Sequence, residues 1–171
     1  MSTHLKHHTA AERPHLKTHH KTLAWVLAAV NEMIEESIYH CQTFAHALRA
    51  HHNSAAAEVF ESLLPHLKTE QHFVLDKLNG MKLPSIPPWE IPHPEYEHPA
   101  MHLFNAHYEM TSDQAWSLVQ SLLKVHSCFY NHLQESLQQD EIQQLLHSLQ
   151  KHGQAWRNQC AAQSANATPN R

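Results

Sequence analysis

The chain has only two glycines, Gly80 and Gly153, in 171 residues. Tight hairpin turns depend on glycine, because its backbone adopts positive φ without a steric cost. An all-β chain needs such a turn roughly every ten residues. The glycine count therefore excludes an all-β fold and favours helices. The length indicates one domain with a single core.

Apolar residues recur three and four positions apart in four segments, as they do on one face of a helix. Polar, capping or proline residues mark the starts of these segments, at Pro14, Ser54, Thr111 and Asp140. The second segment ends at Asn79-Gly80, a typical left-handed helix terminus. We therefore predict an all-α four-helix bundle over residues 14–160.

Six of the nine prolines lie between Pro84 and Pro99. Proline removes a backbone donor and clashes inside helices, so most of this stretch cannot be a regular helix. A short helix is expected only after Pro99. The bundle is thus predicted to consist of two helical hairpins joined by a long Pro-rich crossover at about residues 80–111. A His-rich arm over residues 1–13 and a disordered tail over residues 161–171 are expected to flank it.

Charge and hydropathy limit the classes of partner. The net charge is −4 with histidine neutral, which provides no positive field for a phosphate backbone, so no nucleic-acid partner is expected. No apolar run approaches the roughly 20 residues of a membrane-spanning helix, and the polar amino terminus does not resemble a signal peptide. The three cysteines form no CxxC pair. We expect a cytoplasmic protein with reduced thiols.

Histidine is the compositional outlier, with 20 copies. Imidazole titrates near pH 6.5 and binds transition metals, so this composition predicts metal binding or a response to pH. If Met1 is removed, Ser2-Thr3-His4 offers a terminal amine, two amides and an imidazole as a square-planar site. The metal expected at this N-terminal site is Cu(II) or Ni(II).

One group of polar residues lies within apolar helix faces. His66 and Glu70 are four residues apart and are surrounded by apolar positions, and His126 lies at the centre of the apolar face of the third helix. Because an isolated buried carboxylate is costly, we expect these three side chains to converge in the interior. Two interpretations remain open: a buried Glu–His pair, or a metal site that also includes His152.

The two hairpins share their leucine spacing, since residues 60–70 align with residues 142–152 without a gap. Paired hairpins with a long crossover resemble the ferritin-like superfamily, especially rubrerythrin-type bundles. That resemblance implies a diiron centre held by carboxylates and Glu-x-x-His pairs. Three of the matching positions carry possible ligands, namely Glu32, Glu70 and His152, and leucines occupy others at 67, 123 and 149. The resemblance therefore implies iron with an altered ligand set.

A second resemblance rests on His66-x-x-x-Glu70, which is similar to the second-helix pattern of hemerythrin-like proteins. That family uses histidines and bridging carboxylates to hold two irons. Asn131 and Arg157 stand where an acidic residue would follow His126 or His152, so the second bridging carboxylate is missing. The hemerythrin-like interpretation therefore ranks second.

The first helix carries an additional stripe that includes Trp25, Glu32 and Tyr39. Large aromatic residues on a polar flank are typical interface anchors, which predicts a homodimer through this helix. The leading functional hypothesis is a metal-binding bundle, with iron as the expected metal, that acts in redox chemistry or metal handling. The alternative is a metal-free bundle that works by self-association or by binding a partner.

Overall fold

The structure, a computed structural model, describes residues 22–78, 80–87 and 106–167. This part of the chain contains four α-helices and no strand. The helices are α1 (Leu23–Ala50), α2 (Ser54–Asp76), α4 (Ser112–Ser136) and α5 (Asp140–Ala167). The predicted all-α fold with four helices is confirmed for these residues.

Side chains near the helix starts satisfy exposed backbone donors. Thr22 accepts a hydrogen bond from the Trp25 amide, and Asn53 does the same for Ala56 at the start of α2. Thr111 forms a capping box with Gln114, in which each side chain accepts from the other residue's amide. The predicted break between the first two helices and the predicted cap at residues 111–113 are therefore confirmed.

The first helix begins later than predicted. α1 starts at Leu23 rather than at Pro14, because Thr22 has an extended backbone and acts as the N-cap.

Two further helix ends differ from the sequence prediction. α2 ends at Asp76, a few residues before Gly80, which has the positive φ of 83° expected at a helix terminus. α5 continues to Ala167, so helix occupies part of the segment from residue 161 that we expected to be a disordered tail. Alanine is the strongest helix former, and its frequency after residue 160 accounts for the extension.

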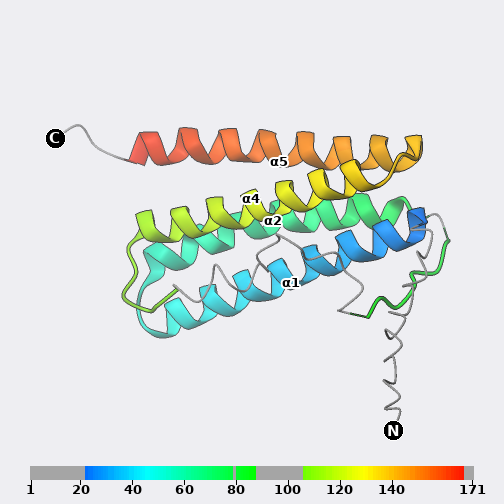
Figure 1. The fold of residues 1–171 in the computed structure, drawn as a ribbon. Helices are drawn as coiled ribbons and strands as arrows, with labels where there is room; N and C mark the ends of the chain where they lie inside the picture. Colours follow the sequence, from blue (N-terminus) through cyan, green and yellow to red (C-terminus); the bar gives the residue numbers. More distant parts are fainter. Residues whose placement is uncertain (1–21, 79, 88–105, 168–171) are drawn as a thin grey trace, which may run out of the picture.

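The helices form two antiparallel hairpins, α1 with α2 and α4 with α5 (Figure 1). α2 packs beside α4, and these two helices run in the same direction (Figure 1). The end of α2 and the start of α4 therefore lie at opposite ends of the bundle (Figure 1). Most of the Pro-rich crossover, the helix expected after Pro99 and the arm at residues 1–13 lie outside the described residues.

The core runs through all four helices and is almost entirely apolar. Its largest fully buried side chains include Phe60, Leu67, Phe129, Tyr130, Leu133, Ile142 and Leu149. Among the described residues, the buried polar or charged side chains are Asn31, Ser37, Glu70 and His126. Because burying a polar group is costly unless it is hydrogen-bonded, these exceptions indicate where to look for a site.

Candidate functional site

α2 directs His66 and Glu70 into the bundle. The helix is continuous through Pro65, so the two residues keep helical i, i+4 geometry. The Glu70 side chain is 2% exposed and that of His66 is 14% exposed. His66 Nε2 lies 3.9 Å from Glu70 Oε2. The carboxylate is thus buried, and the imidazole lies at the edge of the interior.

α4 brings His126 to the same carboxylate oxygen. His126 Nδ1 is 3.9 Å from Glu70 Oε2, and its side chain is as deeply buried as Glu70. The predicted convergence of His66, Glu70 and His126 is therefore confirmed. Their assignment as metal ligands stays a prediction.

Two hydroxyl groups complete the buried cluster, which we define as Ser37, His66, Glu70, His126 and Tyr130. The Tyr130 hydroxyl donates to Glu70 Oε1 over 2.8 Å. The Ser37 hydroxyl on α1 lies 2.8 Å from His126 Nε2 and also donates to the carbonyl of Met33 over 2.9 Å. Three helices therefore contribute to the cluster.

Burial shifts Glu70, His66 and His126 towards their neutral forms. It raises the pKa of Glu70 to about 7, against the hydrogen bond from Tyr130, which lowers it. It lowers the pKa of His66 to about 4, with a smaller contribution from His152. It lowers the pKa of His126 to about 3, with a smaller contribution from His66. Near neutral pH, both imidazoles are uncharged and Glu70 is divided between its two forms.

The two imidazole nitrogens that face Glu70 have no hydrogen-bond partner. In the described part of the chain, only His66 Nε2 and His126 Nδ1 are buried side-chain nitrogen or oxygen atoms without a hydrogen-bond partner. Both lie 3.9 Å from the same carboxylate oxygen, which is too far for a direct hydrogen bond. The cluster thus directs two nitrogens and one oxygen towards a common point.

The remaining predicted ligands are exposed. Glu32 is exposed on α1, and His152 is exposed on α5 with its ring edge against Phe73. Within the described ranges, no group of three or more His, Cys, Asp or Glu side chains is arranged to hold a metal ion. The cluster would therefore have to contract around an ion. The predicted N-terminal copper or nickel site at His4 lies outside the described residues.

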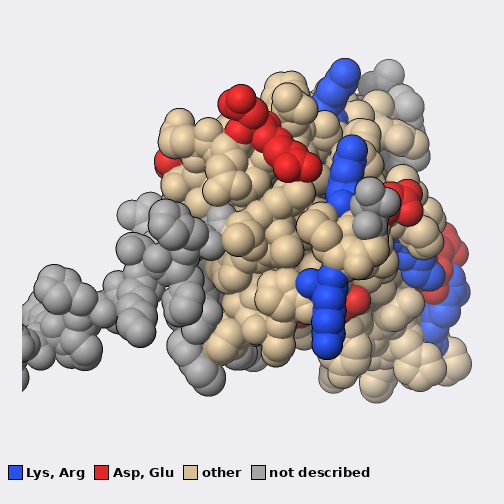
Figure 2. Space-filling model, turned by 90° about the vertical axis from the view of Figure 1, so that its right-hand side faces the viewer, with Lys and Arg blue, Asp and Glu red and all other residues tan. Residues whose placement is uncertain are grey.

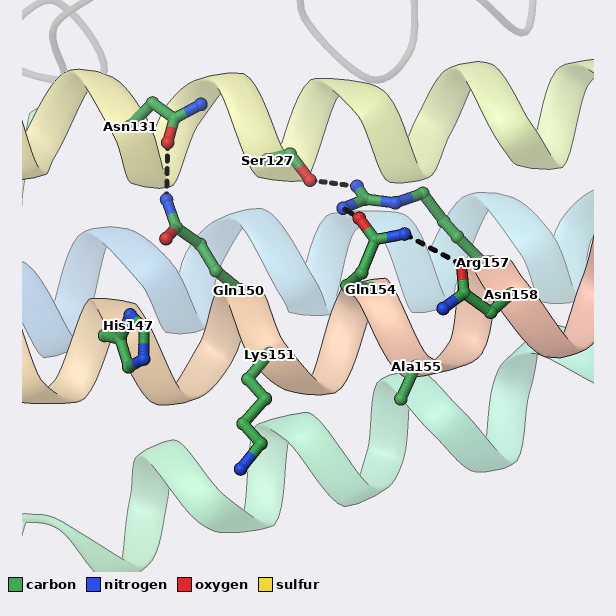
Figure 3. A pocket seen from close by; sticks show the side chains of 9 residues that line it. All are labelled: Ser127, Asn131, His147, Gln150, Lys151, Gln154, Ala155, Arg157 and Asn158. Atoms are coloured by element: carbon green, nitrogen blue, oxygen red, sulfur yellow. Dashed lines mark hydrogen bonds between the residues drawn. The ribbon is translucent and has the colours of Figure 1, made fainter.

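A pocket of about 580 Å³ lies on the outer face of α4 and α5 (Figure 3). Its polar side chains bond to one another: Gln150 donates to Asn131, Gln154 donates to Asn158, and Arg157 donates to Ser127. Lys151 and Ala155 point away from this network (Figure 3). Because these amide and guanidinium donors are already engaged with neighbouring side chains, the network is suited to holding α5 against α4.

The surface contains the aromatic residues of the predicted dimer interface. Tyr39 is 64% exposed on α1, whereas Trp25 is only partly exposed and packs against the core. The homodimer stays a prediction, and of these two aromatic residues Tyr39 is the better anchor. The end of the bundle in Figure 2 shows Lys and Arg interspersed with Asp and Glu rather than one basic patch.

None of the helices in the described residues is long and apolar enough to cross a membrane.

The fold and the cluster define an all-α bundle with a buried carboxylate between two neutral imidazoles. Comparison with known proteins found no family model that matches the chain, no similar curated protein and no similar solved structure. The ferritin-like and hemerythrin-like resemblances therefore stay predictions. The chemistry of the cluster has to be argued from its own atoms.

Proposed function

We propose that the protein binds one divalent transition-metal ion through His66, Glu70 and His126. The observation that carries the proposal is the pair of unpartnered buried nitrogens, His66 Nε2 and His126 Nδ1, each 3.9 Å from Glu70 Oε2. Buried polar atoms are nearly always hydrogen-bonded, so two such atoms around one carboxylate need an explanation. An ion between them would supply a partner for all three atoms.

The donor set favours iron(II) or zinc. Two imidazoles and one carboxylate suit both ions, and a site with three protein ligands leaves positions open for water or substrate. We place iron(II) first, because a two-histidine, one-carboxylate set is typical of non-haem iron sites. This is the same metal that the ferritin-like resemblance implies.

The cluster must contract by a small amount to hold the ion. Ligand atoms on one ion with bonds of about 2.1 Å are about 3.0 to 3.4 Å apart at octahedral or tetrahedral angles. Each imidazole nitrogen must therefore move about 0.5 to 0.9 Å closer to Glu70 Oε2. His66 is at the edge of the interior, where its ring packs edge-on against Trp156.

The metal-free alternative uses the same atoms differently. A proton or a bridging water between Glu70 and an imidazole would also satisfy the unpartnered nitrogens. In that case the cluster is a buried Glu–His pair, and the bundle works by self-association or by binding a partner. The two proposals differ in whether removal of the Glu70 charge changes metal affinity.

The experiment compares the buried pair with a partly exposed pair of the same composition. On α1, Glu36 and His40 are also four residues apart, with 3.6 Å between His40 Nε2 and Glu36 Oε1. The full chain would be purified without a tag or added metal, analysed for bound metal, and titrated anaerobically with Fe(II) and with Co(II) as a spectroscopic probe. The variants are Glu70→Gln and, as the matched control, Glu36→Gln.

We expect one tight equivalent of metal in the unsubstituted chain and in Glu36→Gln. Glu70→Gln should weaken that equivalent at least 100-fold, because it removes a charged ligand without changing the size of the side chain. Circular dichroism would show that both variants remain helical. Equal binding by the unsubstituted chain and Glu70→Gln would overturn the proposal, because the bound metal would then belong to other histidines.

A further inference from the structure

Ser37 has a single hydroxyl proton and two close neighbours. Its Oγ lies 2.9 Å from the Met33 carbonyl oxygen and 2.8 Å from His126 Nε2. A carbonyl oxygen can only accept a hydrogen bond, so both contacts are satisfied together when the serine proton goes to Met33. The serine oxygen then has lone pairs left for His126, and the imidazole must be the donor.

This arrangement fixes the position of the imidazole proton. A neutral imidazole carries one proton, and here Nε2 holds it in order to donate to Ser37. Nδ1 is then a lone-pair nitrogen, and it is the atom that faces Glu70 Oε2 at 3.9 Å without a hydrogen-bond partner. When Glu70 is ionised, two groups that can only accept, one nitrogen and one carboxylate oxygen, thus face the same space.

We infer that Ser37 is a positioning residue that holds His126 in the Nε2-protonated tautomer and thereby offers Nδ1 as the atom that binds a cation. Metal-binding histidines commonly donate their second ring N–H to an oxygen in this way, which sets both the tautomer and the ring orientation. The ligand role of Nδ1 rests on the proposed function. The tautomer itself does not, since it follows from Ser37, Met33 and His126 alone.

The position of the His126 proton also distinguishes a buried Glu–His pair from a cation site. In a buried Glu–His pair, the imidazole would place its proton on Nδ1 and donate it towards Glu70, while Ser37 would turn its hydroxyl to Nε2. In a cation site, the proton is on Nε2 and Nδ1 is free. The tautomer of His126 therefore shows which of the two arrangements the metal-free chain adopts.

Nitrogen NMR on the full metal-free chain with ¹⁵N-labelled histidine tests the inference at pH 8. Protonated and unprotonated ring nitrogens have well-separated shifts, and the His126 signals are those lost in His126→Gln. We expect a protonated Nε2 and an unprotonated Nδ1. A proton on Nδ1 in the unsubstituted chain would overturn the inference whatever the variants show.

Three variants test the role of the hydroxyl. In Ser37→Ala the proton should move to Nδ1, because Nε2 loses its buried acceptor, whereas Ser37→Thr should keep the original tautomer. Ser121→Ala is the matched control, since Ser121 also donates to the carbonyl four residues before it but lies on the surface side of α4. An unchanged tautomer in a folded Ser37→Ala would overturn the role of Ser37.

Metal titration of the same variants separates this inference from the proposed function. With Co(II), Ser37→Ala should bind about 10-fold to 100-fold more weakly than the unsubstituted chain, and Ser37→Thr should restore affinity. If the unsubstituted chain has the Nε2 proton but binds no metal at the cluster, the proposed function fails and the tautomer stands. If metal binds equally to Ser37→Ala, the positioning role fails and the proposed function stands.

Discussion

Two Glu–His pairs in this protein have the same spacing but lie at different depths. His66 with Glu70 and His40 with Glu36 are both spaced i, i+4, with nitrogen–oxygen distances of 3.9 and 3.6 Å. The Glu70 side chain is 2% exposed and that of Glu36 is 32% exposed. Water reaches the partly exposed pair, whereas the buried carboxylate depends on the Tyr130 hydroxyl. Residue type and spacing alone therefore do not make a site.

The largest expected change in stability comes from replacing Glu70 and its hydrogen-bond donor Tyr130 with apolar residues. At pH 8, we expect the metal-free double variant Glu70→Leu with Tyr130→Phe to raise the free energy of unfolding by about 3 kcal/mol. The reason is that a pKa near 7 for Glu70 reflects an ionised carboxylate that is poorly solvated in the folded state. Chemical denaturation of the metal-free protein measures the change.

The exposed pair supplies the control for that variant. Glu36→Leu should change the free energy of unfolding by less than about 0.5 kcal/mol, because a partly exposed carboxylate loses little hydration on folding. A strongly destabilised double variant would show that the buried polar pair contributes net stability. The expectation that burial makes Glu70 costly to stability, unlike Glu36, would then be wrong.

Acid should destabilise the metal-free protein. His66 and His126 have folded pKa values of about 4 and 3, below the ordinary 6.5, so the unfolded chain binds about two more protons as the pH falls below 6.5. Glu70 acts in the opposite direction: its folded pKa of about 7 lies above 4.5, so the folded chain binds one more proton between these values. The net difference is about one proton.

Between pH 7.5 and pH 5, these shifts predict a loss of about 1.5 kcal/mol in the free energy of unfolding. Repulsion among the exposed histidines adds to the loss and should shrink in salt. Thermal melting of the metal-free chain tests this. His66→Gln should flatten the pH profile, because it removes one of the two buried imidazoles. A melting temperature equal or higher at pH 5 would refute the expected direction.

A smaller effect is expected from removing only the hydroxyl that supports Glu70. Tyr130→Phe should lower the free energy of unfolding by about 1 kcal/mol at pH 8, because the ionised carboxylate loses its hydrogen-bond donor. The loss should diminish at pH 5.5, where the folded carboxyl is protonated. A loss of the same size at both values would indicate that the hydroxyl acts through packing alone.

The smallest effect on stability is expected at the surface of α1. Tyr39→Glu should change the free energy of unfolding by less than about 0.5 kcal/mol, because Tyr39 is mostly exposed. If the predicted homodimer forms through this helix, the same variant should reduce the mass in analytical ultracentrifugation to that of one chain. If the unsubstituted chain is already monomeric, the dimer prediction is wrong.

Sequence reasoning found the helices and three of the five residues of the cluster. Periodicity and caps located all four helices, and inward polar positions on apolar faces identified His66, Glu70 and His126. These signals are local, because each depends on residues within one helix. The extension of α5 was missed because its last turns need no apolar face, only alanine.

The hydroxyl partners were harder to predict. Ser37 fills a gap in the apolar stripe of α1 between Ile34 and Cys41, which is a signal that it faces the core. Its contact with His126 spans 89 positions, however, and depends on how the two hairpins dock. The bond from Tyr130 to Glu70 spans 60 positions and depends on the same docking. No periodicity within one helix contains that information.

The parallel arrangement of α2 and α4 has a consequence for folding kinetics. Each hairpin forms from contacts close in sequence, but the cluster forms only when the long connection has brought the hairpins together. Closing a long loop costs entropy before it gains contacts, so docking should be the slow step. If docking is completed after the main barrier, a bound ion would slow unfolding and leave the folding rate unchanged. Residence of the metal would then set the lifetime of the folded chain rather than the speed at which it forms.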